Sequence, residues 1–150
     1  MSKTLKRLLI ATAAGCIFLV AVQVVPYGRN HTNPPVIREP HWDSAETRVL
    51  AKRACFDCHS HETVWAWYSR IAPASWLVQY DVDKGRNELN FSDWQSGVRE
   101  GEHPDKISKE VTEGEMPPLQ YRFAHPEARL SETEKRRLID GLKATAWRNN

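Results

Sequence analysis

The segment RACFDCHSHETVWAWYS, residues 53–69, places two cysteines three positions apart and a histidine directly after the second. Three chemistries use this spacing: a redox dithiol, one half of a zinc site, and covalent attachment of haem. Each of them needs a different setting in the rest of the chain. The fold that this chain can adopt therefore depends on which of the three the remaining sequence supports.

A redox dithiol normally follows a strand and opens a helix within a βαβ pattern. The residues before Cys55 instead predict a helix, and no alternating strand pattern lasts more than a few residues. A zinc site needs four ligands, but the only further cysteine is Cys16, inside an apolar run. The other histidines lack the paired spacing of zinc ligands: His31, His41, His61, His103 and His125. Neither chemistry has the context that it requires.

Covalent haem attachment uses all three residues of the motif. Cys55 and Cys58 are spaced to reach the two vinyl groups on one edge of the porphyrin, and His59 is then held beneath the ring with its imidazole toward the iron. Thioether bonds hold the cofactor permanently, which suits an exported protein. The motif predicts one haem c, attached through Cys55 and Cys58, with His59 as an axial ligand.

The second axial position of the iron has Met116 as its first candidate. This residue, in GEMPP, is the only methionine besides the initiator and lies 57 residues after His59. A thioether ligand stabilises Fe(II) and raises the potential, and the flanking prolines stiffen the loop. Two alternatives stay open: Met116 fills a gap in the core, or His103 or His125 supplies the ligand. His61 is too close to His59 to reach the opposite face.

The N-terminus carries a membrane-targeting pattern. Three basic residues precede LLIATAAGCIFLVAVQVV, an 18-residue run whose only strongly polar member is Gln23. As a helix this run would be about 27 Å long, close to the hydrocarbon thickness of a bilayer. Because it is long and offers a poor cleavage site, we expect an uncleaved anchor over residues 1–25. By the positive-inside rule, the basic residues predict a cytoplasmic N-terminus, so everything from Pro26 onward is expected to be exported.

The length of 150 residues allows one domain beyond this anchor. Residues 26–42 are rich in proline and predict an extended linker, so the domain is expected over residues 43–150. The formal charge of +2 comes from the N-terminus, because without its three basic residues the chain has 18 basic and 19 acidic side chains. No basic patch interleaved with aromatics is present, which argues against a nucleic-acid partner.

Capping and proline signals predict about four short helices. They are a helix capped by Asp43 or Ser44 that leads into Cys55, one from Pro73 to Gly85, one over 103–114, and one after a capping box of Ser131 and Glu134. A short helical turn is expected around Trp94. Residues 115–128 are expected to be irregular because two prolines remove backbone donors. The class is all-α with long loops, which is reasonable if a bulky cofactor forms part of the core.

Five blocks of the sequence carry a resemblance to a known family. They are HTNPPV (31–36), CFDCHSHETVWAWYS (55–69), IAPASWLVQYDVDKGRNELNFSDW (71–94), GEMPP (114–118) and HPEARLSETE (125–134). In this order, they resemble the bacterial haem-binding domain family of short c-type cytochrome-like proteins, over residues 26–145. The resemblance implies a small cytochrome c-like haem domain after one transmembrane helix, with Cys55, Cys58 and His59 binding one haem. Met116 falls in the family's Met-Pro segment, and Ala66 stands where members often have proline.

Several side chains are candidates for contact with the haem. Arg86 is a candidate to pair with a haem propionate, since guanidinium binds carboxylate in a bidentate manner. The alternative is that Arg86 is a solvated residue at a helix end. The aromatic residues either line the haem or form an ordinary core: Trp65, Trp67, Tyr68, Trp76 and Trp94.

These residues predict an electron carrier rather than an enzyme. With both axial positions filled by His59 and Met116, iron has no open site for a substrate, so one-electron transfer to a redox partner protein is the expected activity. A haem-based sensor or a peroxidase-like enzyme, in which Met116 is a labile ligand, is the main alternative. A third is an assembly factor in which haem only stabilises the fold.

Overall fold

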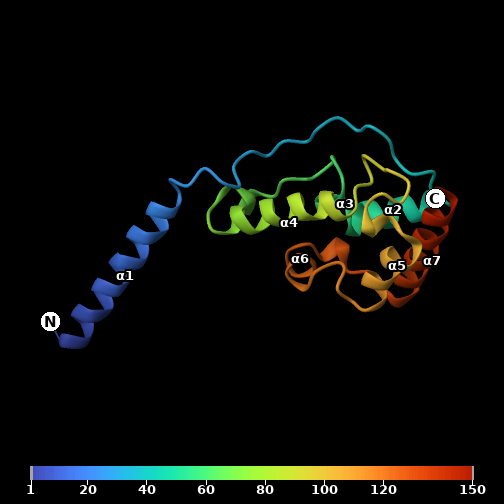
Figure 1. The fold of residues 1–150 in the computed structure, drawn as a ribbon. Coiled ribbons are helices and arrows are strands. Elements are labelled where there is room, and N and C mark those ends of the chain that lie inside the picture. Colours follow the sequence, from blue (N-terminus) through green and yellow to red (C-terminus); the bar gives the residue numbers. More distant parts are fainter. Residues whose placement is uncertain (1, 150) are drawn as a thin grey trace. The chain divides into compact units, whose positions relative to one another are not determined.

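The computed structural model of the chain describes residues 2–149, and within them it is helical, with no strand and one isolated bridge between Arg38 and Asp93 (Figure 1). The all-α class predicted from the sequence is confirmed. The α-helices are α1 (Lys3–Val22), α2 (Ala45–Ala54), α3 (Phe56–His59), α4 (Ala74–Glu88), α5 (Pro104–Thr112), α6 (Leu119–Ala124) and α7 (Glu132–Asn149). Three short 3₁₀ helices join them: η1 (Trp67–Arg70), η2 (Glu100–Glu102) and η3 (Pro126–Ala128).

The chain divides into two compact units. The first combines the N-terminal residues up to His31 with Trp65–Tyr80, and the second combines Thr32–Val64 with the residues from Asp81 onward. Helix α4 contributes residues to both.

The first unit contains α1, which the Ser2 side chain caps by accepting a hydrogen bond from the Leu5 amide. Among residues 2–149, α1 is the one helix long and apolar enough to cross a membrane. A signal sequence near the N-terminus can meet the same criteria of length and hydropathy. The expected N-terminal apolar helix is therefore present.

Three helices of the second unit, α2, α5 and α7, begin where the capping signals predict. The Ser44 side chain accepts from the Thr47 amide at the start of α2. Ser131 and Glu134 form the reciprocal capping box before α7, each side chain accepting from the other's backbone amide. Pro104 opens α5.

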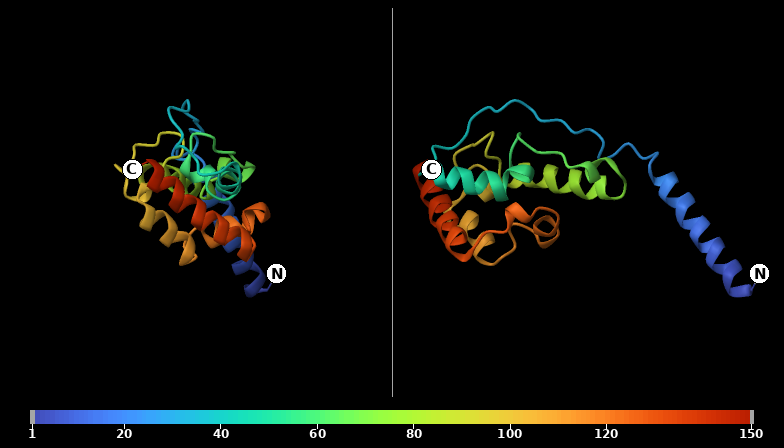
Figure 2. Two further views of the ribbon diagram at one scale, coloured as in Figure 1. Left: turned by 90° about the vertical axis from the view of Figure 1, so that its right-hand side faces the viewer. Right: turned by 180° about the vertical axis from the view of Figure 1, so that it is seen from behind.

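The core of the second unit lies among α2, α5 and α7: α5 packs along α7, and α2 contacts α7 (Figure 2). A row of aromatic rings runs through it, with Phe91 at 5.4 Å from Phe56 and 6.3 Å from Trp94, centroid to centroid. Aliphatic side chains complete the core: Leu50, Ile107, Val111, Leu138 and Leu142. Trp94 is thus a core residue packed against Phe91.

Two expectations for the loops are wrong. Residues 115–128 are not irregular throughout, because Pro118 serves as the N-cap of α6 and Pro126 opens η3. Proline is tolerated in these positions, since the first amides of a helix have no partner within it. Trp94 lies outside any helix, because its amide donates to the carbonyl of Arg38 instead.

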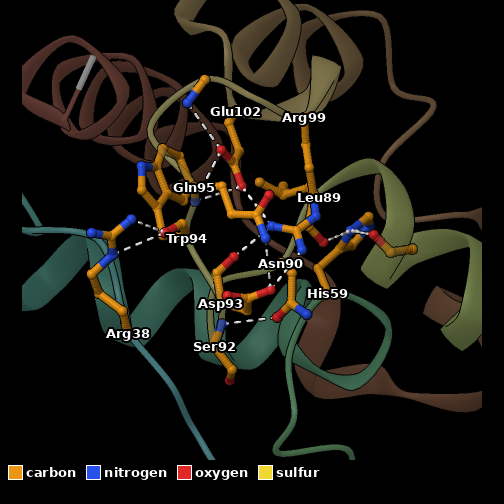
Figure 3. A network of polar contacts seen from close by, with 12 residues as sticks. Arg38, His59, Leu89, Asn90, Ser92, Asp93, Trp94, Gln95, Arg99 and Glu102 are labelled. Atoms are coloured by element: carbon orange, nitrogen blue, oxygen red, sulfur yellow. Dashed lines mark hydrogen bonds and ion pairs between the residues drawn. The ribbon is translucent and has the colours of Figure 1, made fainter.

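The segment predicted as a linker makes backbone contacts within the second unit. The amides of Ile37 and Arg38 donate to the Ser92 carbonyl, and the Arg38 guanidinium donates to the Trp94 carbonyl (Figure 3). Residues 32–42 therefore form part of this unit's hydrogen-bonded structure.

Helix α7 lies close to α2 at Gly141, where an added Cβ would collide with the buried side chain of Thr47. Gly141→Ala should therefore lower the free energy of unfolding by about 1–3 kcal/mol, as overpacking does. Urea unfolding followed by circular dichroism measures this. The loss should be smaller in a Thr47→Ala background, and an equal loss in both backgrounds would show that the contact is not its cause.

Candidate functional site

The cysteine motif forms one helical turn directly after α2. Cys55 is the C-cap residue of α2, and its amide donates to the Ala51 carbonyl. Helix α3 then runs from Phe56 to His59. Phe56, between the two cysteines, is 1% exposed and fixes this turn to the aromatic row of the core. Residues three apart lie on one face of a helical turn. The core thus holds Cys55 and Cys58 on the same side.

His59 is buried, and its ring is oriented by the end of α4. Its Nδ1 lies 2.9 Å from the carbonyl oxygen of Gly85 and 3.1 Å from that of Leu89 (Figure 3). Carbonyls only accept hydrogen bonds, so Nδ1 carries the proton and Nε2 keeps its lone pair. Burial lowers the pKa of His59, which favours the neutral ring. A carbonyl partner on one ring nitrogen is the usual arrangement for a histidine whose other nitrogen binds a metal.

The backbone of His59 is tied to the same region, because its carbonyl accepts from the Phe91 amide at 2.8 Å. Gly85 makes this approach possible. An added Cβ at Gly85 would lie 2.5 Å from the carbonyl oxygen of Cys58. Helix α4 continues three residues beyond Gly85, to Glu88, although the sequence predicted an end near this glycine. The glycine serves close packing rather than termination.

The two thiols are poor candidates for thiolate chemistry. Burial raises the pKa of both Cys55 and Cys58 to about 12, with nearby negative charge as a further cause. A redox dithiol acts as a thiolate, which a raised pKa disfavours. Within residues 2–149, no group of three or more His, Cys, Asp or Glu side chains is placed to hold a metal ion. Neither the dithiol nor the zinc interpretation gains support.

A contact that sequence reasoning missed joins the motif to α6. The Asp57 carboxylate, between the two cysteines, accepts from the Tyr121 hydroxyl at 2.7 Å and from the Val64 amide at 2.8 Å. Tyr121 also stacks on His125 at 4.3 Å. Burial and the Asp57 charge raise the pKa of the Tyr121 phenol far above its usual range, so it remains a donor. Asp57 and Tyr121 are 64 residues apart, and no sequence pattern relates them.

Met116 is half-buried and packs against the same core cluster as Cys55. Its amide donates to the Glu110 carbonyl at 3.0 Å, which fixes the loop to α5. Met116 therefore lies beside the core that supports the cysteine turn. Along the chain it stands between α5 and α6, the helix that bears Tyr121.

His61 and His125 have protein partners. His61 contacts the Pro35 carbonyl through Nδ1 and the Asn90 amide through Nε2, so both ring nitrogens are engaged. His125 pairs with Glu127 in addition to its stacking on Tyr121. His103 precedes α5 as its N-cap residue.

Arg86 binds protein acceptors around the chain that follows His59. It donates to the Ser60 carbonyl at 2.8 Å and to the Thr63 hydroxyl at 3.0 Å. Its remaining bonds reach the Thr32 carbonyl and the Asn33 side chain. This network gives Arg86 a structural role in holding the loop after the cysteine turn.

The site therefore consists of two protonated thiols on one turn and a buried, neutral imidazole whose Nδ1 is engaged by carbonyls. Comparison with known families assigns residues 17–144 to the haem-binding domain family. The chain belongs to this family, and it is a haem-binding protein. Searches among curated proteins and among solved structures gave no match. The donor set fits haem, since the imidazole is already in the form that binds iron.

Gly85→Ala tests how the site is supported. The new methyl group would push α4 away from Cys58, which should cost about 1–3 kcal/mol of stability and withdraw the carbonyls that orient His59. Haem per polypeptide should fall, as measured by pyridine haemochrome absorbance. Lys84→Ala, at the exposed neighbouring position, should leave it unchanged. Full haem content in Gly85→Ala would contradict this role for the glycine.

Proposed function

We propose that this protein is a membrane-anchored c-type cytochrome-like electron carrier with one covalently attached haem. The observation that carries the proposal is the helical turn on which Cys55 and Cys58 lie on one face. His59 follows directly, and the carbonyls of Gly85 and Leu89 hold its ring. When bound, the haem supplies a reversible one-electron couple at its iron.

The residues of the turn have distinct roles in this proposal. Cys55 and Cys58 provide the sulfur atoms of two thioether bonds, so they tether the cofactor and take no part in redox change. His59 provides Nε2 as an axial ligand. The two carbonyls on Nδ1 fix the tautomer and the ring orientation, and they increase the electron donation of the imidazole.

Met116 is the proposed second axial ligand. A ligand on a loop must be held in place, and two contacts do this: the Met116 amide binds the Glu110 carbonyl, and Tyr121, just downstream, binds Asp57 inside the motif. If His59 and Met116 both bound the iron, it would have no open site for a substrate. Transfer of electrons to a redox partner protein, rather than catalysis, is the activity that this arrangement supports.

The proposed location is the periplasmic face of a bacterial inner membrane. Helix α1 is 20 residues long, or about 30 Å, which matches the hydrocarbon thickness. Lys3, Lys6 and Arg7 lie at its N-terminal end, which favours a cytoplasmic N-terminus. Covalent attachment of the haem is consistent with this location, because an exported protein keeps a cofactor that is bound permanently.

Covalent attachment predicts that haem remains on the polypeptide after denaturation. The double variant Cys55→Ser/Cys58→Ser should lose all haem staining on a denaturing gel, because no thioether bond can form. Cys16→Ser, in α1, is the matched control and should keep full staining. Staining that persists in the double variant would rule out attachment through these thiols.

Ligation by Met116 predicts a low-spin spectrum with the methionine-to-iron charge-transfer band in the oxidised protein. Met116→Ala should lose this band while keeping covalent haem. Leu119→Ala, an exposed position three residues later, should keep it. A high-spin ferric spectrum in the wild type, or rapid CO binding to the reduced wild type, would instead support a sensor or a peroxidase-like enzyme with a labile ligand.

A further inference from the structure

The parts of the first unit that lie outside α1 have an unusual composition. Residues 23–31 and 65–80 together hold three of the six tryptophans and three of the four tyrosines of the chain. Their only charged side chains are Arg29 and Arg70, and they contain no Asp or Glu. Trp, Tyr and Arg without acidic residues are typical of protein surfaces at the boundary between lipid tails and headgroups.

The fold fixes these two segments to each other at the end of α1. Gln23, the C-cap of α1, donates to the Ala72 carbonyl at 2.9 Å and accepts from the Ala72 amide at 3.0 Å. The Gly28 backbone lies so close to the Ser75 carbonyl that a Cβ could not fit. His31 donates to the Ser69 carbonyl at 2.9 Å and stacks on Trp65 at 4.5 Å.

These contacts define the depth of the second segment relative to α1. Because Ala72 is within hydrogen-bond distance of Gln23, the chain around Ile71 lies at the level where α1 ends. Figure 1 shows this loop beside the C-terminal end of α1. If α1 spans a bilayer, its last turn reaches the boundary of the hydrocarbon layer. The loop before α4 then lies at that boundary as well.

The side chains that this region exposes are large and apolar. Trp67 is 76% exposed and Tyr80 is 54% exposed, and Leu77 lies three residues before Tyr80 on α4. We call the exposed set the aromatic surface: Val24, Tyr27, Trp67, Ile71, Leu77 and Tyr80. Exposure of so many large apolar groups in one small unit indicates that something covers them.

We propose that the aromatic surface lies in the interfacial layer of the bilayer that α1 crosses, with Arg29 and Arg70 near lipid phosphates. The proposal rests on α1 being a retained transmembrane helix and is independent of the haem. The surface has the chemistry of an interfacial anchor, with aromatic rings at headgroup depth, aliphatic side chains toward the tails, and arginines for the phosphates. The match to the haem-binding domain family begins at residue 17, inside α1, so the end of this helix belongs to the family domain.

Lipid quenching of tryptophan emission tests the proposal. Full-length haem protein is placed in vesicles of phosphatidylcholine and phosphatidylglycerol, with or without bromine atoms on the acyl carbons nearest the headgroups. The brominated lipid should reduce the emission of the wild type. Trp67→Phe should show a loss of this quenching, because Trp67 is the most exposed tryptophan of the first unit. Substitution at so exposed a position should leave the fold intact.

Trp147→Phe is the matched control, since Trp147 is 66% exposed but lies on α7 in the second unit. Its quenching should equal that of the wild type. Equal quenching in wild type and Trp67→Phe would overturn the proposal and would indicate that haem or a partner protein covers Trp67 instead.

Two further measurements separate this proposal from the electron-transfer proposal. The intact mass shows whether residues 2–22 remain in the mature protein, and the absorption spectrum shows whether haem is bound. Loss of these residues would overturn the interfacial placement and the anchor together, whatever the spectrum shows. A retained α1 without quenching at Trp67 would overturn the interfacial placement alone.

Discussion

The hydrogen bonds from His59 Nδ1 to the carbonyls at the end of α4 are the interaction on which the rest of the site depends. They require α4 to approach the cysteine turn closely, and Gly85 is the position that permits it. They also require the chain after α4 to double back, so that the Phe91 amide reaches the His59 carbonyl and Phe91 enters the aromatic row. One histidine thereby couples the site, the length of α4 and the packing of the core.

The sequence made haem binding predictable but not the contacts that support the cysteine turn. The spacing of Cys55, Cys58 and His59 is local, so it can be read directly, and so can the caps at Ser44 and Ser131. The partners of His59 are backbone carbonyls, which every residue has, and only the tertiary fold selects Gly85 and Leu89. For the same reason the partners of Arg86 could not be anticipated, because its bonds join loops that are distant in sequence.

The misread segments share a physical cause. The prolines of residues 115–128 predict an irregular segment, yet proline costs nothing in the first turn of a helix, where the amides have no acceptor. Gly85 suggested a helix end, whereas its lack of a side chain serves a close contact. The aromatic packing of the core was equally out of reach of sequence patterns, because Trp42, Phe56, Phe91 and Trp94 come from separate segments and meet in stacked or tilted pairs only in the tertiary fold.

The hydrogen bond between Asp57 and Tyr121 has a consequence for the order in which the site is completed. Synthesis proceeds from the N-terminus, so the cysteine turn emerges long before Leu89, and Leu89 well before Tyr121. In chain order the turn comes first, the carbonyls that support His59 come next, and Tyr121 comes last. The contact between Asp57 and Tyr121 therefore cannot form until the chain has been made through α6.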